Sequence, residues 1–263
     1  MQPEIMPPEN PPELKPVQPD RGLWGPWQTI GLGVAIFAIN FTIEAVVVVA
    51  FFVSKWVTNP GGDLFKLAQS LSTNGLLISV ATITSGIIGV GFIILFIRIR
   101  KGAPISEYLG LKKIKGVIIL ILLGTVIVLL AISFGMEQVI KEPQDTTFMV
   151  DTYRTSVWPV MFWISVVVFA PAFEEAFFRG FLFSGLQYSR IGAVGTILLT
   201  AVTWAVLHIQ YSPFGMVSIL VLGLVFGIVR LKTNSLWSTI FLHSLWNLAA
   251  TIQTVLYING IGQ

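Results

Sequence analysis

The chain has 263 residues; 54% of them are hydrophobic, only 11% are charged, and the mean hydropathy is +0.82, which excludes an ordinary soluble globular domain and indicates a polytopic membrane protein. The formal net charge is +3, but the basic residues lie between apolar runs instead of forming one stripe, so we expect no nucleic-acid partner. The chain has no cysteine, which excludes a disulfide framework and a thiolate site.

Residues 1–27 contain eight of the 14 prolines, and they lack both a basic n-region and an apolar h-region. This composition predicts a disordered, proline-rich cytoplasmic tail rather than a signal peptide. Residues 28–257 contain the long apolar runs, so we expect them to form a single transmembrane domain.

Seven apolar runs have about the 20 residues that a helix needs to cross roughly 30 Å of hydrocarbon. They are residues 28–53, 76–97, 116–135, 158–187, 191–211, 213–230 and 235–257. The last four follow one another with almost no loop, so we expect them to form a tight antiparallel bundle. The predicted fold class is therefore all-α, a polytopic transmembrane helix bundle with about seven spans and short interfacial helices.

The basic residues predict the orientation of this domain. Eleven of them would share the side of the N-terminus: Lys15, Arg21, Arg98, Arg100, Lys101, Lys112, Lys113, Lys115, Arg190, Arg230 and Lys232. Four would lie on the other side: Lys55, Lys66, Lys141 and Arg154. Because cytoplasmic loops carry the excess of lysine and arginine, we expect a cytoplasmic N-terminus and an outward C-terminus.

The segment Pro104–Lys115 mixes apolar residues with three lysines. This mixture fits a short helix that lies in the cytoplasmic interface of the membrane, and it fits a plain basic loop equally well.

The stretch Trp158–Leu186 is among the most apolar of the chain, yet it contains Glu174, Glu175 and Arg179. Each charge at a membrane centre costs roughly 2.5 to 3.5 kcal/mol on an insertion scale, so these side chains need partners or water. Residues four apart share a helix face, whereas adjacent residues diverge by about 100°. We therefore expect Glu175 to pair with Arg179 and Glu174 to remain a free general base. The alternative is that all three only anchor neighbouring helices through ion pairs.

The only two histidines, His208 and His243, lie in later apolar runs, and Asn247 shares a helix face with His243. Such residues also serve as plain hydrogen-bonding contacts between membrane helices. Since the acidic pair and both histidines fall in the four closely linked C-terminal runs, we expect them to converge on one cavity.

Two chemistries fit this set of residues. In the first, Glu174 removes a proton from a water held by His208, while His243 and Asn247 bind the oxyanion that develops on a peptide carbonyl. In the second, His208 and His243 bind zinc together with Glu174 or Glu175 and leave one position for water. The chain has no His-Glu-x-x-His helix, so the metal-free route is preferred.

These residues resemble the motifs of the CPBP family, the intramembrane proteases that include type II CAAX prenyl endopeptidases and bacterial bacteriocin-processing or self-immunity proteins. The family's Glu-Glu-x-x-x-Arg matches residues 174–179, and its His-x-x-x-Asn matches residues 243–247. Its Phe-x-x-x-His appears with Trp204 in place of the phenylalanine before His208. The resemblance covers about residues 155–250, the expected catalytic core.

The resemblance implies an intramembrane endopeptidase of a bacterial cell membrane, acting on a membrane-anchored or membrane-inserted peptide with or without a lipid group. It implies that Glu174 is the catalytic carboxylate, that Glu175 and Arg179 support it, and that the two histidines and Asn247 bind water, metal or the oxyanion. Members of the family are described as metalloproteases and also as metal-free glutamate enzymes, so zinc stays an alternative.

Two other functions compete with this interpretation. Buried acids with histidines also relay protons or ions in membrane transporters, but a transporter predicts internal repeats, and the two halves of the chain show none. A catalytically silent immunity or scaffold protein would act through helix contacts alone, and the complete acidic and histidine set argues against it. Glu44, in the first apolar run, either joins the site or meets Asn40 one turn earlier, and the second is the expected arrangement.

Overall fold

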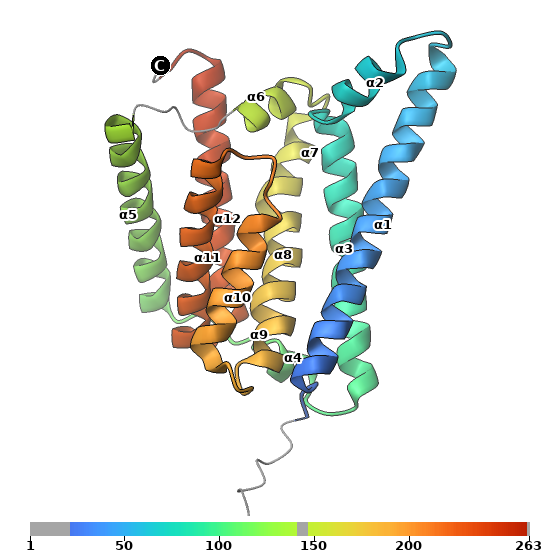
Figure 1. Ribbon diagram of the computed structural model, residues 1–263. Coiled ribbons are helices and arrows are strands. Elements are labelled where there is room, and N and C mark those ends of the chain that lie inside the picture. The colour runs from blue at the N-terminus through green and yellow to red at the C-terminus, as the bar shows by residue number, and fades with distance from the viewer. Residues whose placement is uncertain (1–21, 141–146, 262–263) are drawn as a thin grey trace, which may run out of the picture.

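The computed structural model describes residues 22–140 and 147–261, and within these ranges every regular element is a helix. The predicted tail, residues 1–27, lies outside the described residues apart from its last six, which lead into the first helix. The predicted all-α class is confirmed. The N-terminal end of the first helix and the C-terminal end of the last lie at opposite ends of the bundle (Figure 1).

Five helical stretches are long and apolar enough to cross a membrane. They are α1 (Pro26–Thr58), α3 (Gly75–Arg100), the residues Gly116–Met136 of α5 (Gly116–Ile140), the run Pro159–Leu186, and α11 (Pro213–Thr233). All seven predicted runs are helical, but the remaining two do not meet these criteria. The helix α10 (Gly192–Val206) has only 15 residues, and α12 (Leu236–Ile258) carries many polar residues along its length.

The predicted run 191–211 ends five residues early. The helix α10 stops at Val206, and residues 207–210 form a turn before α11 begins at Pro213. Proline disfavours helical backbone at the residue before it, and the Ser212 hydroxyl accepts a hydrogen bond from the Gly215 amide as the cap of α11. His208 therefore lies on a turn and not within a helix.

Three short helices lie outside the long ones: α2 (Leu64–Leu71), α4 (Ile105–Tyr108) and α6 (Thr147–Arg154). The helix α4 falls in the predicted interfacial segment, but its apolar side chains face the protein. Tyr108 is 1% exposed and stacks on Phe181, and the Ser184 hydroxyl donates to the Tyr108 carbonyl oxygen at 2.5 Å. Burial raises the pKa of Tyr108 to about 12, so its phenol stays neutral.

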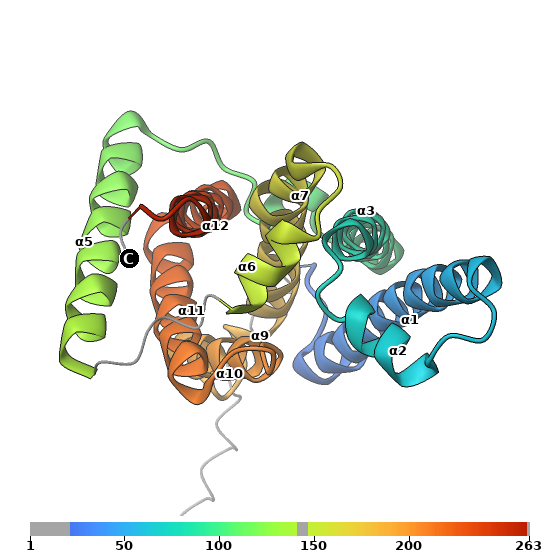
Figure 2. The same cartoon turned by 90° about the horizontal axis from the view of Figure 1, so that it is seen from above.

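The helices pack around the central run Pro159–Leu186. The helices α1 and α3 pack on each other at one side of the bundle, and α5 lies at the opposite side, next to α12 (Figures 1 and 2). The run Pro159–Leu186 lies between them and contacts α3 on one side and α12 on the other. The helices α10 and α11 approach closely where Gly227 faces Ile197, since a Cβ on Gly227 would lie 2.7 Å from that side chain.

The run Pro159–Leu186 is not one regular α-helix. It consists of α7 (Pro159–Ile164), the π-helical segment η1 (Ser165–Phe169), α8 (Ala170–Glu175), the π-helical segment η2 (Ala176–Leu182) and α9 (Phe183–Leu186). Glu174 and Glu175 are the last two residues of α8, between the two π-helical segments. Short π-helical segments within α-helices are frequently found at functional sites.

Candidate active site

The predicted ion pair between Glu175 and Arg179 is confirmed. Arg179 Nη1 donates to Glu175 Oε1 at 2.9 Å, and both side chains are completely buried. His243 Nδ1, on α12, lies 3.0 Å from the same carboxylate oxygen. Arg179 Nη2 donates to the Gly223 carbonyl oxygen of α11 at 3.0 Å. Glu175 and Arg179 thus join three parts of the bundle behind the cavity described below.

Glu174 points away from this ion pair, as the helical spacing predicts. Its side chain is half-buried, and its Oε2 accepts a hydrogen bond from Trp204 Nε1 at 2.5 Å. Within the described residues, no hydrogen bond reaches its Oε1. Glu174 therefore has one carboxylate oxygen fixed by an indole and one available to a ligand.

Trp204 also orients His208. The His208 Nδ1 lies 2.7 Å from the Trp204 carbonyl oxygen, and a carbonyl oxygen only accepts, so this nitrogen carries the proton. In the neutral ring, Nε2 is then an acceptor. The Trp204 indole is 3% exposed and lies edge-on to both histidines, with ring centroids 5.0 Å from His208 and 5.4 Å from His243.

Asn247 is held by a backbone carbonyl that the π-helical segment leaves free. The Ala170 amide bonds to the Ser165 carbonyl five residues back, so the next bond of this pattern would join residue 171 to Val166. Residue 171 is proline and has no amide hydrogen. The free Val166 oxygen instead accepts a hydrogen bond from Asn247 Nδ2 at 2.9 Å, which places the side-chain amide of Asn247, on α12, against η1.

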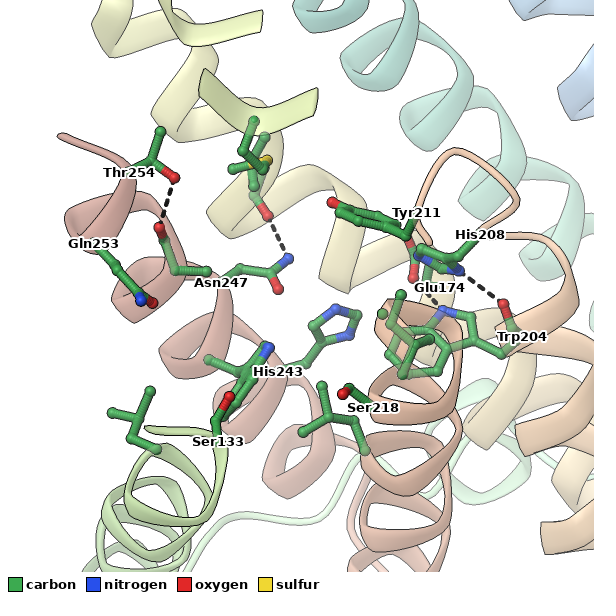
Figure 3. Close-up of a pocket in the computed structure, with 18 of the residues that line it drawn as sticks. Ser133, Glu174, Trp204, His208, Tyr211, Ser218, His243, Asn247, Gln253 and Thr254 are labelled. Carbon is green, nitrogen blue, oxygen red and sulfur yellow. Dashed lines mark hydrogen bonds between the residues drawn. The ribbon is translucent and has the colours of Figure 1, made fainter. Parts of the chain in front are cut away.

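A cavity of about 200 Å³ contains the predicted site, and we call it the active-site cavity. Its polar lining includes Glu174, Trp204, His208, His243 and Asn247. Figure 3 shows these side chains around one space, with Tyr211 and Ser218 beside them. The predicted convergence of the acid, both histidines and the amide on one cavity is confirmed, whereas Glu175 and Arg179 do not line it.

Comparison with protein families agrees with this geometry. Residues 156–249 match the family described as type II CAAX prenyl endopeptidase Rce1-like. This match supports membership of the CPBP family. The match contains most of the residues that line the active-site cavity, whereas α5, α6 and the second half of α12 complete its wall from outside the match. Comparison with curated proteins and with solved structures gave no match.

CPBP membership indicates an intramembrane protease, and it makes the tryptophan at position 204 informative. The family motif has a phenylalanine at this position, which provides an aromatic ring but no donor. In this chain the ring packs against both histidines, and its N–H binds the carboxylate of Glu174. The sequence shows that the substitution keeps an aromatic ring, but the hydrogen bond depends on the distance between α8 and α10, which the sequence does not reveal.

A catalytic zinc ion would need three protein ligands around one point. In the described part of the chain, no three histidine, aspartate or glutamate side chains lie close enough together to hold a metal ion. His243 Nδ1 and Glu175 Oε1 already bind each other, and the Trp204 ring packs against both histidines. This arrangement does not fit the three-ligand site that the zinc alternative needs, so no step of the reaction below uses a metal.

Arg230 is a site-supporting residue that the sequence did not reveal. The distribution of basic residues predicts a cytoplasmic position for it, but its side chain is only 2% exposed. Its Nε donates to the Arg179 carbonyl oxygen at 2.8 Å, and its Nη1 donates to Asn234 Oδ1 at 2.8 Å. Arginines near helix ends commonly reach outward to the membrane surface, so nothing local indicated this inward position.

The expected contact of Glu44 with Asn40 is confirmed, at 3.2 Å between Asn40 Nδ2 and Glu44 Oε1. The same oxygen also accepts the Ser85 hydroxyl of α3 at 2.9 Å.

Proposed function

We propose that this protein is an intramembrane endopeptidase in which Glu174 activates a water molecule for attack on a peptide bond. The observation that carries the proposal is the position of Glu174 Oε1, which accepts no hydrogen bond from the described residues and belongs to a side chain lining the same cavity as His208, His243 and Asn247. Membership of the CPBP family supports the same class of activity.

The water would lie between Glu174 and His208. Glu174 Oε1 accepts one proton of this water, and His208 Nε2 accepts a hydrogen bond from the other, because the Nδ1 of that ring donates to the Trp204 carbonyl. A positioned general base of this kind typically accelerates proton transfer about 10² to 10⁴-fold. Trp204 holds the second oxygen of Glu174, so the carboxylate presents one fixed oxygen to the water.

The attack forms a bond between the water oxygen and the carbonyl carbon, and negative charge develops on the carbonyl oxygen. Asn247 uses one amide hydrogen for Val166, which leaves the second for this oxygen. His243 supplies another donor when its Nε2 carries a proton, since the Glu175 carboxylate binds Nδ1 and orients the ring. The C–N bond then breaks, and the proton held by Glu174 passes to the leaving amine.

The substrate in this proposal is a membrane-anchored or membrane-inserted peptide. Backbone groups exposed to lipid lack hydrogen-bond partners, so a peptide must be unwound inside a protein cavity to be cut within the membrane. A lipid group on the substrate is compatible with the large apolar surface of the bundle. We also propose a cytoplasmic N-terminus, because the basic residues of the α3–α4 segment lie at the end of the bundle where α1 begins (Figure 1).

The test is cleavage of a library of membrane-tethered peptides by the purified protein in lipid nanodiscs. Glu174→Gln keeps the size of the side chain and its acceptor oxygen but removes the base, so we expect cleavage to fall about 10² to 10⁴-fold. Glu107→Gln is the matched control, because Glu107 is exposed on α4, away from the cavity. Equal cleavage by the wild type and Glu174→Gln would exclude Glu174 as the base.

A further inference from the structure

A second cavity, of about 560 Å³, adjoins the active-site cavity at Glu174, and we call it the Glu44 cavity. It is lined by residues of α1, α3, η1, α8, η2, α10 and the turn that follows α10. Three residues line both cavities: Glu174, Trp204 and His208. A peptide whose scissile bond lies at Glu174 in the active-site cavity therefore has the Glu44 cavity directly beside that bond.

Glu44 is the acidic residue of α1 that lines this second cavity. Both of its hydrogen bonds, from Asn40 and from Ser85, reach the same oxygen, Oε1. In the described part of the chain, no hydrogen bond reaches Oε2. These partners are an amide and a hydroxyl, so neither carries a charge that would neutralise the carboxylate.

The walls of the Glu44 cavity leave its negative charge uncompensated. Of the described residues that line it, none is lysine or arginine, whereas two, Glu44 and Glu174, are acidic. The lining also includes His208, whose Nδ1 hydrogen is bound by the Trp204 carbonyl oxygen and which the proposed reaction uses as a neutral acceptor for the water. Arg179 is the buried cation that lies nearest to Glu174 along the sequence, but it is already bound to Glu175 behind the active-site cavity. Acidic residues within membrane spans are kept mainly where a partner or a ligand meets them. The missing positive charge would therefore come from outside the chain.

We propose that the Glu44 cavity is a substrate subsite that binds a lysine or arginine side chain near the scissile bond, with Glu44 as the residue that determines this specificity. Phe37 and Phe41 of α1 and Phe173 of α8 line the same space. Their rings pack against the aliphatic part of a long basic side chain, and aromatic faces also attract its cationic head. The proposal rests on the proposed protease function and adds the chemical class of the substrate residue.

The subsite is tested with membrane-tethered peptides that differ at one position at a time, within four residues of the bond that is cut. Lysine, arginine, glutamine, norleucine or glutamate is placed at each position. The nanodiscs contain phosphatidylglycerol only, so no lipid amine supplies the cation. We expect the wild type to cleave the lysine or arginine peptide at one position about tenfold or more faster, in kcat/KM, than the norleucine peptide.

Glu44→Gln preserves the shape and one acceptor oxygen, and it should reduce this ratio to about one. Glu44→Asp, which keeps the charge, should retain the preference, and Glu107→Gln is the control for an unrelated acidic residue. Glu44→Lys should favour the glutamate peptide. If a Glu44 variant does not fold, the peptide series on the wild type still decides the matter, since no preference for a basic residue at any position would overturn the proposal.

Binding separates this proposal from the proposed function. The Glu174→Gln variant should bind the lysine peptide more tightly than the norleucine peptide whether or not it cleaves them, and adding Glu44→Gln should remove the difference. If Glu174→Gln cleaves as well as the wild type, the proposed function fails. If Glu174 is essential and the basic peptides have no advantage in either binding or cleavage, only the subsite fails.

Discussion

The C-terminal helices and the α1–α3 pair each place a carboxylate in an apolar span, but they provide different partners for it. Glu175 is completely buried and meets a guanidinium at 2.9 Å and an imidazole at 3.0 Å. Glu44 is half-buried and meets only an amide and a hydroxyl. Glu174 lies between these two regions and has a single donor, the Trp204 indole.

This difference separates carboxylates that hold the bundle together from those available for chemistry. Glu175 is held through Oε1 by Arg179 and His243, and its Oε2, although it has no partner among the described residues, is buried and lines neither cavity, so no ligand reaches it. Removing such a buried charge leaves its partners unpaired. A carboxylate with a free oxygen on a cavity can bind water or a cation. The following variants test this distinction, beginning with the largest expected effect.

Glu175→Gln should destabilise the fold by about 3 to 5 kcal/mol, because it leaves the Arg179 guanidinium buried without a counter-ion. Unfolding of the purified protein in mixed micelles with increasing denaturing detergent measures this change. The double variant Glu175→Gln with Arg179→Met should recover much of the loss, since no buried charge remains. A loss below about 1 kcal/mol in the single variant would show that the ion pair does not hold the bundle.

Trp204→Phe should lower kcat about 10 to 100-fold with little change in KM, because it removes the donor to Glu174 and keeps an aromatic ring between the histidines. The expected decrease in kcat corresponds to the loss of one hydrogen bond to a charged group, which is worth about 1.5 to 3 kcal/mol. Steady-state kinetics on a cleaved peptide measure the two constants. Trp237→Phe, at a position 48% exposed on α12, is the matched control. An unchanged kcat would mean that other groups position Glu174.

Ser85→Ala should cost only about 0.6 kcal/mol of stability, the average for a hydrogen bond between membrane helices. The lost bond is the 2.9 Å contact from the hydroxyl to Glu44. The same detergent unfolding experiment measures it, which makes the value directly comparable with that of Glu175→Gln. A cost as large as that of the ion pair would contradict the contrast between the two regions.

A chelator should leave the cleavage rate unchanged, because the described histidine and carboxylate side chains do not gather into a three-ligand set. The rate is measured before and after prolonged dialysis against the chelator, and again after zinc is returned. Loss of activity that zinc restores would overturn the metal-free reaction and would require the site to rearrange around the ion.

Local patterns predicted a large part of this protein. Apolar runs of about 20 residues predicted the long helices, and the spacing of four predicted the contacts of Glu175 with Arg179 and of Asn40 with Glu44. The end of α10 was wrong by five residues, although Pro213 and its cap Ser212 carried a signal for it. The two π-helical segments had no such signal, apart from Pro171.

The sequence alone therefore determined a helical membrane protein, the family motifs, and the pairings within single helices, because these depend on residues at most a few positions apart. The tertiary structure decided which groups on other helices meet each carboxylate and the catalytic amide. The contacts of Trp204 with Glu174, of Asn247 with Val166 and of Ser85 with Glu44 join residues 30, 81 and 41 positions apart. They depend on how separate helices approach one another, and a distance of a few ångströms between helices is set by the packing of the whole bundle.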